Sequence, residues 1–301
     1  MHNLSGIHSA LITPFDDAGA VDTSALSDLV RFELGQGIDG FYVGGSTGEA
    51  FLQNAVERAA FLAAVAHEVA AVDPSATLIA HVGAIATSEA LELGRAAVGA
   101  GYHAISAIPP FYYEFSREQH LAHYFELADR IALPLLVYNF PKRVGTALGT
   151  AQLLQLLEHP NIVGIKHTSQ DLYQLEQIKR ARPDAILFNG FDEMFLAGLA
   201  MGADGAIGST YNFMGALFVA MRERFVAGHA ADALALQRTA NQVIDMLVEV
   251  GVFEGTKRIL AVLGHDCGPC RKPFLPLAPA ALARVDACVR EVLLPALALH
   301  P

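Results

Sequence analysis

The sequence is poor in three features, and each shortage excludes a class of protein. Only three of its 301 residues are cysteines, too few for a disulfide framework, which fits a protein of the reducing cytoplasm. No stretch approaches the roughly 18 consecutive apolar residues that a membrane-spanning helix requires. Basic residues number 20 against 31 acidic ones, and the resulting net charge of -11 argues against nucleic acid or an anionic membrane surface as a partner.

Apolar residues, by contrast, are abundant. They make up 53% of the chain, and the mean hydropathy is +0.36. The first six residues show no basic region followed by an apolar core, so we expect no signal peptide. Because no membrane span accounts for the apolar excess, we expect it in a large core and in an interface between subunits.

Short apolar runs alternate with longer amphipathic stretches along the first two hundred residues. Strands are predicted at Ile7–Ile12, Gly40–Val43, Leu78–Val82, Ala104–Ile108, Leu135–Tyr138, Ile162–Lys166, Ala185–Asn189 and Gly205–Ile207. Helices are predicted between them at Ser24–Gln36, Ala55–Ala71, Ser88–Ala100, Arg117–Arg130, Ala151–Glu158, Leu172–Arg180 and Glu193–Gly202. The alternation predicts an α/β fold, a (β/α)8 TIM barrel.

Beyond Gly208 the pattern predicts helices alone. They are expected at Phe213–Ala227, Ala231–Gly251, Gly255–Leu263 and Ala280–Ala296. No linker rich in proline or serine separates them from the barrel. We therefore expect a barrel over residues 1–211 that carries the active site, and a C-terminal helical region over residues 212–301 packed on it.

The unusual residues of the chain follow the predicted strands. In TIM barrels the chemistry takes place at the C-terminal ends of the strands and in the loops after them. The motifs found there run over residues 44–49, 110–113, 138–141, 166–169, 189–193 and 208–210. The sequence therefore predicts that these six stretches meet at one face of the barrel.

Lys166 ends the apolar run Ile162–Ile165, and its position is unusual. A charged amine is costly at the end of a buried strand, because desolvation disfavours the charged form. One interpretation is a lysine that reaches the surface or pairs with a carboxylate. The other is a lysine whose lowered pKa leaves a free amine that attacks a carbonyl and forms a Schiff base.

Two neighbouring features bear on that choice. Residues 44–49, Gly44-Gly45-Ser46-Thr47-Gly48-Glu49, offer backbone N–H groups and hydroxyls to a small anion, but lack the ending of a nucleotide P-loop and would also suit a tight turn. Tyr138 ends the preceding strand. It is either a residue of the barrel rim with its hydroxyl in water, or a proton shuttle that passes its proton on through the hydroxyl of Thr47 or Tyr112.

Two further motifs have competing interpretations. Asp192 and Glu193 either form the acidic first turn of a helix or recognise sugar hydroxyls, and in both cases they disfavour a phosphate site. Cys267-Gly268-Pro269-Cys270 matches a redox motif, but it lies in the helical tail instead of a small αβ domain, so we do not assign it a redox role. His120 and His123 share a helical face, and one such pair does not make a metal site.

Together these residues resemble the pyruvate-dependent class I aldolase family, which includes N-acetylneuraminate lyase and dihydrodipicolinate synthase. The resemblance runs from Leu11-Ile12-Thr13-Pro14-Phe15 to Cys270-Arg271-Lys272-Pro273-Phe274, almost the whole chain. It is stronger to the lyases than to the synthases. The lyase-like stretches are Tyr42–Phe51, Pro110–Tyr113, Lys166–Ser169 with Asp171–Gln174, Asn189–Glu193 and Gly208–Asn212.

The resemblance implies a role for each site residue. Lys166 is expected to form an imine with the C2 carbonyl of an open-chain sugar acid, and Tyr138 to take the proton from its C4 hydroxyl. Ser46 and Thr47 are expected to hold the pyruvate carboxylate. The polyol is expected to bind Thr168, Gly190, Asp192, Glu193 and Ser209. Tyr112 matches a family tyrosine that crosses a subunit contact to complete a proton relay.

The resemblance also implies the partners and cofactors. The substrates are expected to be pyruvate and an aldehyde sugar, and the assembly a homotetramer. Because the imine itself accepts the electrons of the broken bond, neither a cofactor nor a metal is implied.

Three residues depart from the lyase pattern and leave the second substrate open. Arg143 stands where lyases carry an apolar residue, whereas synthases carry an arginine there that binds the carboxylate of their second substrate. Phe140 is bulkier than the usual aliphatic residue, and Pro109 replaces a threonine. The alternatives are therefore a dihydrodipicolinate synthase, a lyase for another 2-keto-3-deoxy sugar acid, and, more remotely, a barrel that binds a keto acid without catalysis.

Overall fold

In the computed structural model, residues 2–145 and 148–300 are described, and their strands form one closed parallel barrel in the order β1 to β8. The strands are β1 (Gly6–Ala10), β2 (Gly40–Val43), β3 (Thr77–His81), β4 (Ala104–Ala107), β5 (Leu135–Asn139), β6 (Ile162–His167), β7 (Ile186–Asn189) and β8 (Gly205–Gly208). Each predicted strand is therefore confirmed, with ends that differ by two residues at most.

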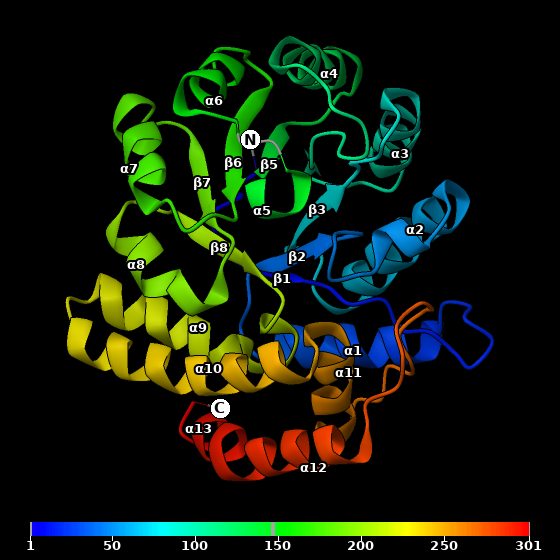
Figure 1. Cartoon of the computed structure of the whole chain (residues 1–301), viewed down its shortest axis with the longest axis vertical. Coiled ribbons are helices and arrows are strands. Elements are labelled where there is room, and N and C mark those ends of the chain that lie inside the picture. The colour runs from blue at the N-terminus through cyan, green and yellow to red at the C-terminus, as the bar shows by residue number, and fades with distance from the viewer. Residues whose placement is uncertain (1, 146–147, 301) are drawn as a thin grey trace.

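Helices surround the barrel as predicted (Figure 1). The helices after β1 to β7 are α1 (Thr23–Gly35), α2 (Ala55–Val72), α3 (Thr87–Gly99), α4 (Arg117–Arg130), α5 (Pro141–Val144), α6 (Thr150–Leu156), α7 (Leu172–Ala181) and α8 (Phe195–Ala200), with short 3₁₀ turns η1 (Ala50–Leu52) and η2 (Asp192–Met194). Asp22 caps α1, because its carboxylate accepts hydrogen bonds from the amides of Ser24 and Ala25. The one-turn helix α5 was missed by the prediction.

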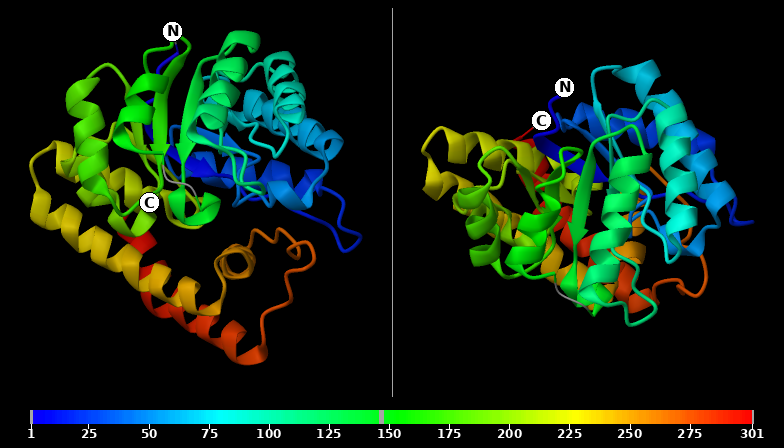
Figure 2. Two further views of the ribbon diagram at one scale, coloured as in Figure 1. Left: turned by 45° about the horizontal axis from the view of Figure 1, so that its top comes forward. Right: turned by 90° about the horizontal axis from the view of Figure 1, so that it is seen from above.

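After β8 the chain is helical. The elements are α9 (Tyr211–Val226), α10 (Ala230–Val250), α11 (Val252–Leu263), α12 (Pro279–Cys288), the π turn η3 (Val289–Leu293) and α13 (Leu294–Ala298). Helix α9 packs against β1, α1 and α8, whereas α10 to α13 gather on one side of the barrel (Figures 1 and 2). The division between residues 211 and 212 stays a prediction.

The core has two parts, and strand alternation separates them. Side chains such as Leu136, Tyr138 and Phe188 point into the barrel, whereas Val137 and Ile165 point outward against the helices. Successive side chains of a strand alternate between faces, so Lys166, next to the outward Ile165, must point inward. The barrel closes where β1 meets β8, and Gly205 is required there because a Cβ would collide with the carbonyl oxygen of Gly6.

No helix in the described ranges is both long and apolar enough to cross a membrane.

Candidate active site

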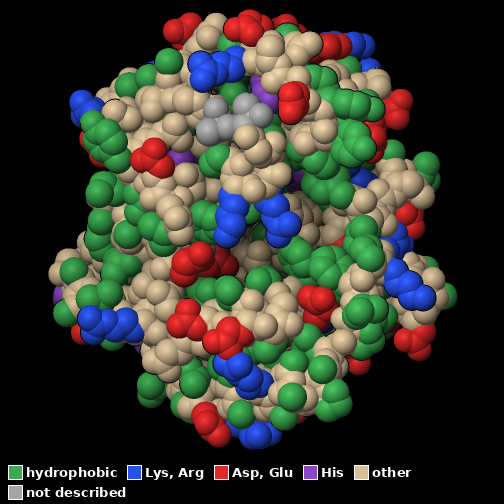
Figure 3. Space-filling view, viewed as in Figure 1, with side chains coloured by type: hydrophobic (Ala, Val, Ile, Leu, Met, Phe, Trp, Pro, Cys, Tyr) green, Lys and Arg blue, Asp and Glu red, His purple; other side chains and the backbone are tan. Residues whose placement is uncertain are grey.

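A cavity of about 620 Å³ opens at the C-terminal ends of the strands. Figure 3 shows the hollow on the face viewed in Figure 1, with basic and acidic side chains gathered around it. Nine of the ten predicted site residues line this cavity, namely Ser46, Thr47, Tyr138, Lys166, Thr168, Gly190, Asp192, Glu193 and Ser209. The predicted meeting of the strand-end motifs is therefore correct for these residues.

Lys166 is buried at the floor of the cavity, with only 5% of its surface exposed. Its Nζ lies 4.2 Å from the ring centre of Tyr42 and 4.3 Å from that of Tyr138. Burial lowers the pKa of the Lys166 amine from 10.5 to about 7, and the carboxylate of Asp192 opposes this effect. Near neutral pH a large fraction of this lysine is therefore the free amine, which is the nucleophilic form.

Tyr138 is the direct neighbour of Lys166 in the barrel. The two residues are paired in register on β5 and β6, so their side chains point to the same interior. Burial raises the pKa of the Tyr138 phenol to about 12, while the hydroxyls of Thr168 and Ser46 and the charge of Arg143 lower it by less. The phenol is therefore protonated at neutral pH, and can accept a proton only as it passes its own to another group.

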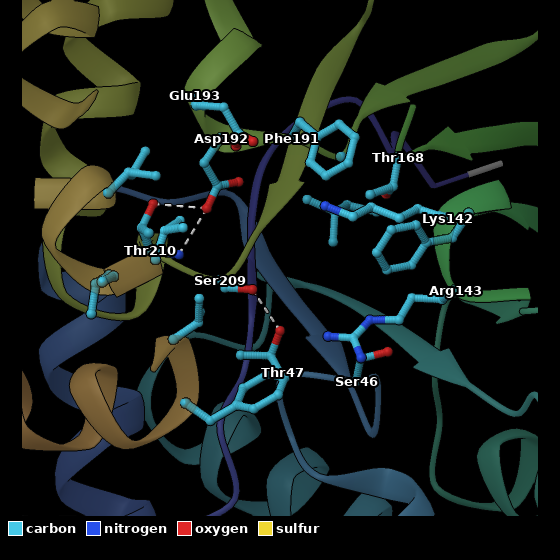
Figure 4. A pocket seen from close by; sticks show the side chains of 18 of the residues that line it. Ser46, Thr47, Lys142, Arg143, Thr168, Phe191, Asp192, Glu193, Ser209 and Thr210 are labelled. Carbon is cyan, nitrogen blue, oxygen red and sulfur yellow. Dashed lines mark hydrogen bonds between the residues drawn. The ribbon is translucent and has the colours of Figure 1, made fainter. Parts of the chain in front are cut away.

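The loop of residues 44–49, called here the 44–49 loop, connects β2 to η1. The hydroxyl of Thr47 lies 2.7 Å from that of Ser209, which joins this loop to the end of β8 (Figure 4). The carbonyl of Gly48 accepts hydrogen bonds from Thr13 Oγ1 and Gln53 Nε2, both at 2.7 Å. The loop is thus fixed at its middle and at its far end, which keeps the hydroxyls of Ser46 and Thr47 directed at the cavity.

Asp192 faces the cavity from the opposite wall. Its Oδ2 accepts hydrogen bonds from the amide of Thr210 at 2.9 Å and from the Thr210 hydroxyl at 2.8 Å (Figure 4). Burial nevertheless raises the pKa of this carboxyl to about 6. Its other oxygen, Oδ1, is buried without a hydrogen-bond partner in the described part of the chain. An unsatisfied buried acceptor is unfavourable, so a donor on a ligand would bind well there.

Gly190 lies two residues before Asp192, at a position where the structure leaves no room for a side chain. A Cβ at this position would collide with Oγ1 of Thr168 on the next strand end. The close approach of the two loops leaves both Thr168 and the Gly190 backbone at the cavity surface.

Arg143 and Lys142 lie on the rim, on the short helix α5. The Arg143 guanidinium extends toward Ser46 (Figure 4). Arg143 also lines a smaller adjoining cavity of about 350 Å³. None of the carboxylates in the described ranges forms a salt bridge with Arg143. Because α5 was not predicted, only the structure shows that this arginine and the acids Asp192 and Glu193 border the same cavity.

The outer wall of the cavity was missed by sequence analysis. It consists of side chains from α10, α11 and the segment after α11, namely Ile244, Leu247, Val248, Val252, Phe253, Glu254 and Phe274. All of them except Phe274 lie in helices whose periodicity is that of any packed amphipathic helix, so no sequence signal distinguishes these helical residues. The C-terminal helices therefore belong to the site as well as covering the barrel.

Tyr112 is the predicted site residue that lies elsewhere. Its side chain is 72% exposed, beside the also exposed Tyr113, with ring centres 5.0 Å apart. Phe51 and Phe111 pack edge to face nearby, at 4.7 Å between ring centres. Within one chain Tyr112 contributes nothing to the cavity, which leaves its expected role dependent on a second subunit.

Neither cysteine of the Cys267–Cys270 pair lines the cavity. Cys267 and Cys270 are free thiols in the segment between α11 and α12. Burial raises the pKa of each thiol to about 12, so the reactive thiolate is scarce at neutral pH. Across the described residues, no three histidine, cysteine or acidic side chains are grouped as a metal site would require.

Comparison with known proteins gives consistent matches over nearly the whole chain. The model of the dihydrodipicolinate synthetase family matches residues 3–292. An N-acetylneuraminate lyase of Rhizobium meliloti is 55% identical over 96% of this chain and 96% of its own length. Among solved structures, CdNal of Clostridium difficile in complex with mannosamine is 33% identical and covers 96% of this chain and 99% of its own, with a TM-score of 0.93. The N-acetylneuraminate lyase of Fusobacterium nucleatum complexed with pyruvate is 33% identical and covers 96% and 97%, with a TM-score of 0.91.

Proposed function

The chain belongs to the dihydrodipicolinate synthetase family, and we propose that it cleaves N-acetylneuraminate reversibly to pyruvate and N-acetylmannosamine. The observation that carries the proposal is Lys166, a buried amine with a pKa of about 7 at the floor of the cavity. The relatives support the choice of substrate, because their names or ligands include N-acetylneuraminate, pyruvate and mannosamine.

The first step is attack by the free amine of Lys166 on the C2 carbonyl of the open-chain sugar acid. The carbinolamine that results loses water and leaves a protonated imine. The aromatic faces of Tyr42 and Tyr138 at 4.2 and 4.3 Å from Nζ favour a positive charge at this nitrogen. The imine then acts as the acceptor for the electrons of the bond that breaks.

The second step is cleavage of the C3–C4 bond. Tyr138 takes the proton of the C4 hydroxyl as that oxygen becomes the carbonyl of N-acetylmannosamine, and the bonding electrons enter the imine to form an enamine. Because the Tyr138 phenol has a pKa of about 12, it must pass its own proton on during the same step, through the neighbouring hydroxyls of Ser46 and Thr47 to water, and water returns a proton when C3 is protonated. Protonation of the enamine at C3 and hydrolysis of the imine release pyruvate and restore Lys166.

The remaining cavity residues hold the two ends of the substrate. Ser46 and Thr47 bind the carboxylate through their hydroxyls and the amides of the 44–49 loop. The unpaired Oδ1 of Asp192 accepts a hydrogen bond from a sugar hydroxyl. Thr168, Gly190, Glu193 and Ser209 supply the other polar contacts to the polyol from the cavity wall.

The assembly and the compartment are part of the proposal. The exposed aromatic cluster around Tyr112 is an apolar surface of the kind that subunit contacts cover, and the apolar composition supports a homotetramer. In that assembly Tyr112 would reach the proton relay of a neighbouring subunit. The three free cysteines support the reducing cytoplasm as its location. Sedimentation of the purified chain, together with turnover by Tyr112→Phe, tests the first two points.

Arg143 favours a second candidate function, the condensation of pyruvate with aspartate semialdehyde. Its guanidinium borders the cavity without a carboxylate partner in the described ranges, so it can bind an anionic aldehyde. Against this stand Asp192 and Glu193 across the same cavity, which favour a neutral polyol and repel a second carboxylate. The polyol therefore remains the first choice.

One set of assays separates the candidates. Pyruvate release is measured with N-acetylneuraminate and with other 2-keto-3-deoxy sugar acids, beside a condensation assay with aspartate semialdehyde. Borohydride treatment with pyruvate should add one reduced pyruvyl group, and peptide mapping should find it on Lys166. Labelling at another lysine refutes the mechanism, and labelling at Lys166 without turnover of any substrate indicates a barrel that only binds the keto acid.

A further inference from the structure

Glu49 has a backbone conformation that is unfavourable for its side chain. With φ of 55° and ψ of 35° it lies in the left-handed region, the one residue other than glycine with positive φ in the described ranges. Such a conformation persists where the surroundings determine it, and it clusters at functional sites. The amide of Glu49 donates a hydrogen bond to the carbonyl of Ser46 at 3.1 Å, so this residue closes the 44–49 loop.

The Glu49 side chain is buried and bound by the C-terminal part of the chain. Its Oε1 lies 3.1 Å from Nζ of Lys257, and the two side chains are 1% and 5% exposed. Its Oε2 accepts a hydrogen bond from the amide of Arg271 at 2.7 Å, across more than two hundred residues of sequence. The position of the Glu49 carboxylate is therefore determined by residues that follow the barrel in the sequence.

Lys257 connects this carboxylate to the outer wall of the cavity. It lies on α11, one turn after Phe253, which lines the cavity. Its ammonium also donates to the carbonyl of Pro269 at 2.8 Å and lies 4.6 Å from the ring centre of Phe15. Truncating one member of a buried ion pair leaves the other charge uncompensated, so neither side chain can move alone at low cost.

We propose that Glu49 is a positioning residue for the aldolase reaction, holding the 44–49 loop in register with helix α11 through its buried pair with Lys257. The inference rests on the proposed function, since it assigns the loop to the substrate carboxylate. Glu49 does not line the main cavity, and it acts through Ser46 and Thr47. The proposal predicts that the affinity for pyruvate depends on the contact between Glu49 and Lys257 of helix α11.

The test compares Glu49→Gln, Lys257→Met and the double variant with the unmodified protein. The pyruvate concentration for half-maximal borohydride trapping should rise roughly tenfold in Glu49→Gln, as expected when a binding group is displaced by a fraction of an ångström. Trapping at saturating pyruvate should stay complete, because Lys166 lies on another strand. Amide hydrogen exchange over residues 44–52 should become faster.

The double variant separates positioning from folding. It removes the uncompensated charge, so its thermal midpoint should recover toward that of the unmodified protein, while its half-maximal pyruvate concentration stays raised. Asp286→Asn is the matched control. It removes the carboxylate on α12 that pairs at 2.7 Å with Arg258, the residue after Lys257 on α11, and it should leave trapping unchanged.

Two results would overturn the inference. One is unchanged half-maximal trapping and unchanged exchange in Glu49→Gln, and the other is a double variant that recovers pyruvate affinity together with stability. Absence of trapping in the unmodified protein refutes the proposed function instead, and the exchange of residues 44–52 still decides whether Glu49 holds the loop.

Discussion

The pKa of Lys166 makes the most direct prediction, because the structure supplies both its value and its cause. If burial lowers this pKa to about 7, then about half of the amine is neutral at pH 7. An ordinary lysine with a pKa near 10.4 is neutral to only about 0.04% at that pH. The neutral fraction of Lys166 at pH 7 should therefore exceed that of a free lysine side chain by about 10³-fold.

The assay is the rate at which a small amine-directed acylating reagent modifies Lys166 between pH 5 and 10, followed by peptide mass mapping. N-acetyl-lysine amide under the same conditions is the reference. The rate at Lys166, corrected by the reference for the reagent itself, should level off above about pH 7. Asp192→Asn should move this inflection to lower pH, because the Asp192 carboxylate raises the pKa of Lys166.

An inflection near pH 10 would refute the reasoning, and so would an upward shift in Asp192→Asn. In the first case the lysine would be solvated as an ordinary surface amine. In the second, Asp192 would not act on Lys166 through its charge.

Three further predictions follow from the same geometry. Tyr138→Phe should still form the pyruvate imine in borohydride trapping but lose roughly 10²–10⁴-fold in turnover, and near-normal turnover would exclude the phenol as proton carrier. Arg143→Leu should leave cleavage of N-acetylneuraminate unchanged or improved and abolish any condensation with aspartate semialdehyde, whereas loss of cleavage would contradict the lyase assignment. Lys166→Met should abolish trapping and raise the free energy of unfolding, by at most about 5 kcal/mol below pH 7. Between about pH 7 and 10.5 the unmodified folded state binds fewer protons than the unfolded state, so the unmodified protein gains stability as the pH rises and the advantage of the variant should fall. A gain that grew with pH in thermal unfolding would show the opposite shift.

The barrel and most of the cavity were predictable from local patterns in the sequence. Mostly apolar runs of three to six residues bounded by glycine or polar residues identified every strand, since strands buried on both faces need no alternation. Parallel strands direct their C-terminal ends to one face, so Tyr138, Lys166 and Asp192 could be placed together before any contact was known. Helix α5 was missed because four residues are too few to show a helical period.

Only the tertiary structure decided what surrounds these residues. The pKa of Lys166 depends on burial by Tyr42 and Tyr138 from other strands, and the pairing of Thr47 with Ser209 joins positions 162 residues apart. Local periodicity reports which face of an element is apolar, but not which distant element covers that face. The outer wall from α10 and α11 and the buried pair of Glu49 with Lys257 therefore leave no local pattern, because each arises from packing between segments that are separate in the sequence, about two hundred residues apart for Glu49 and Lys257.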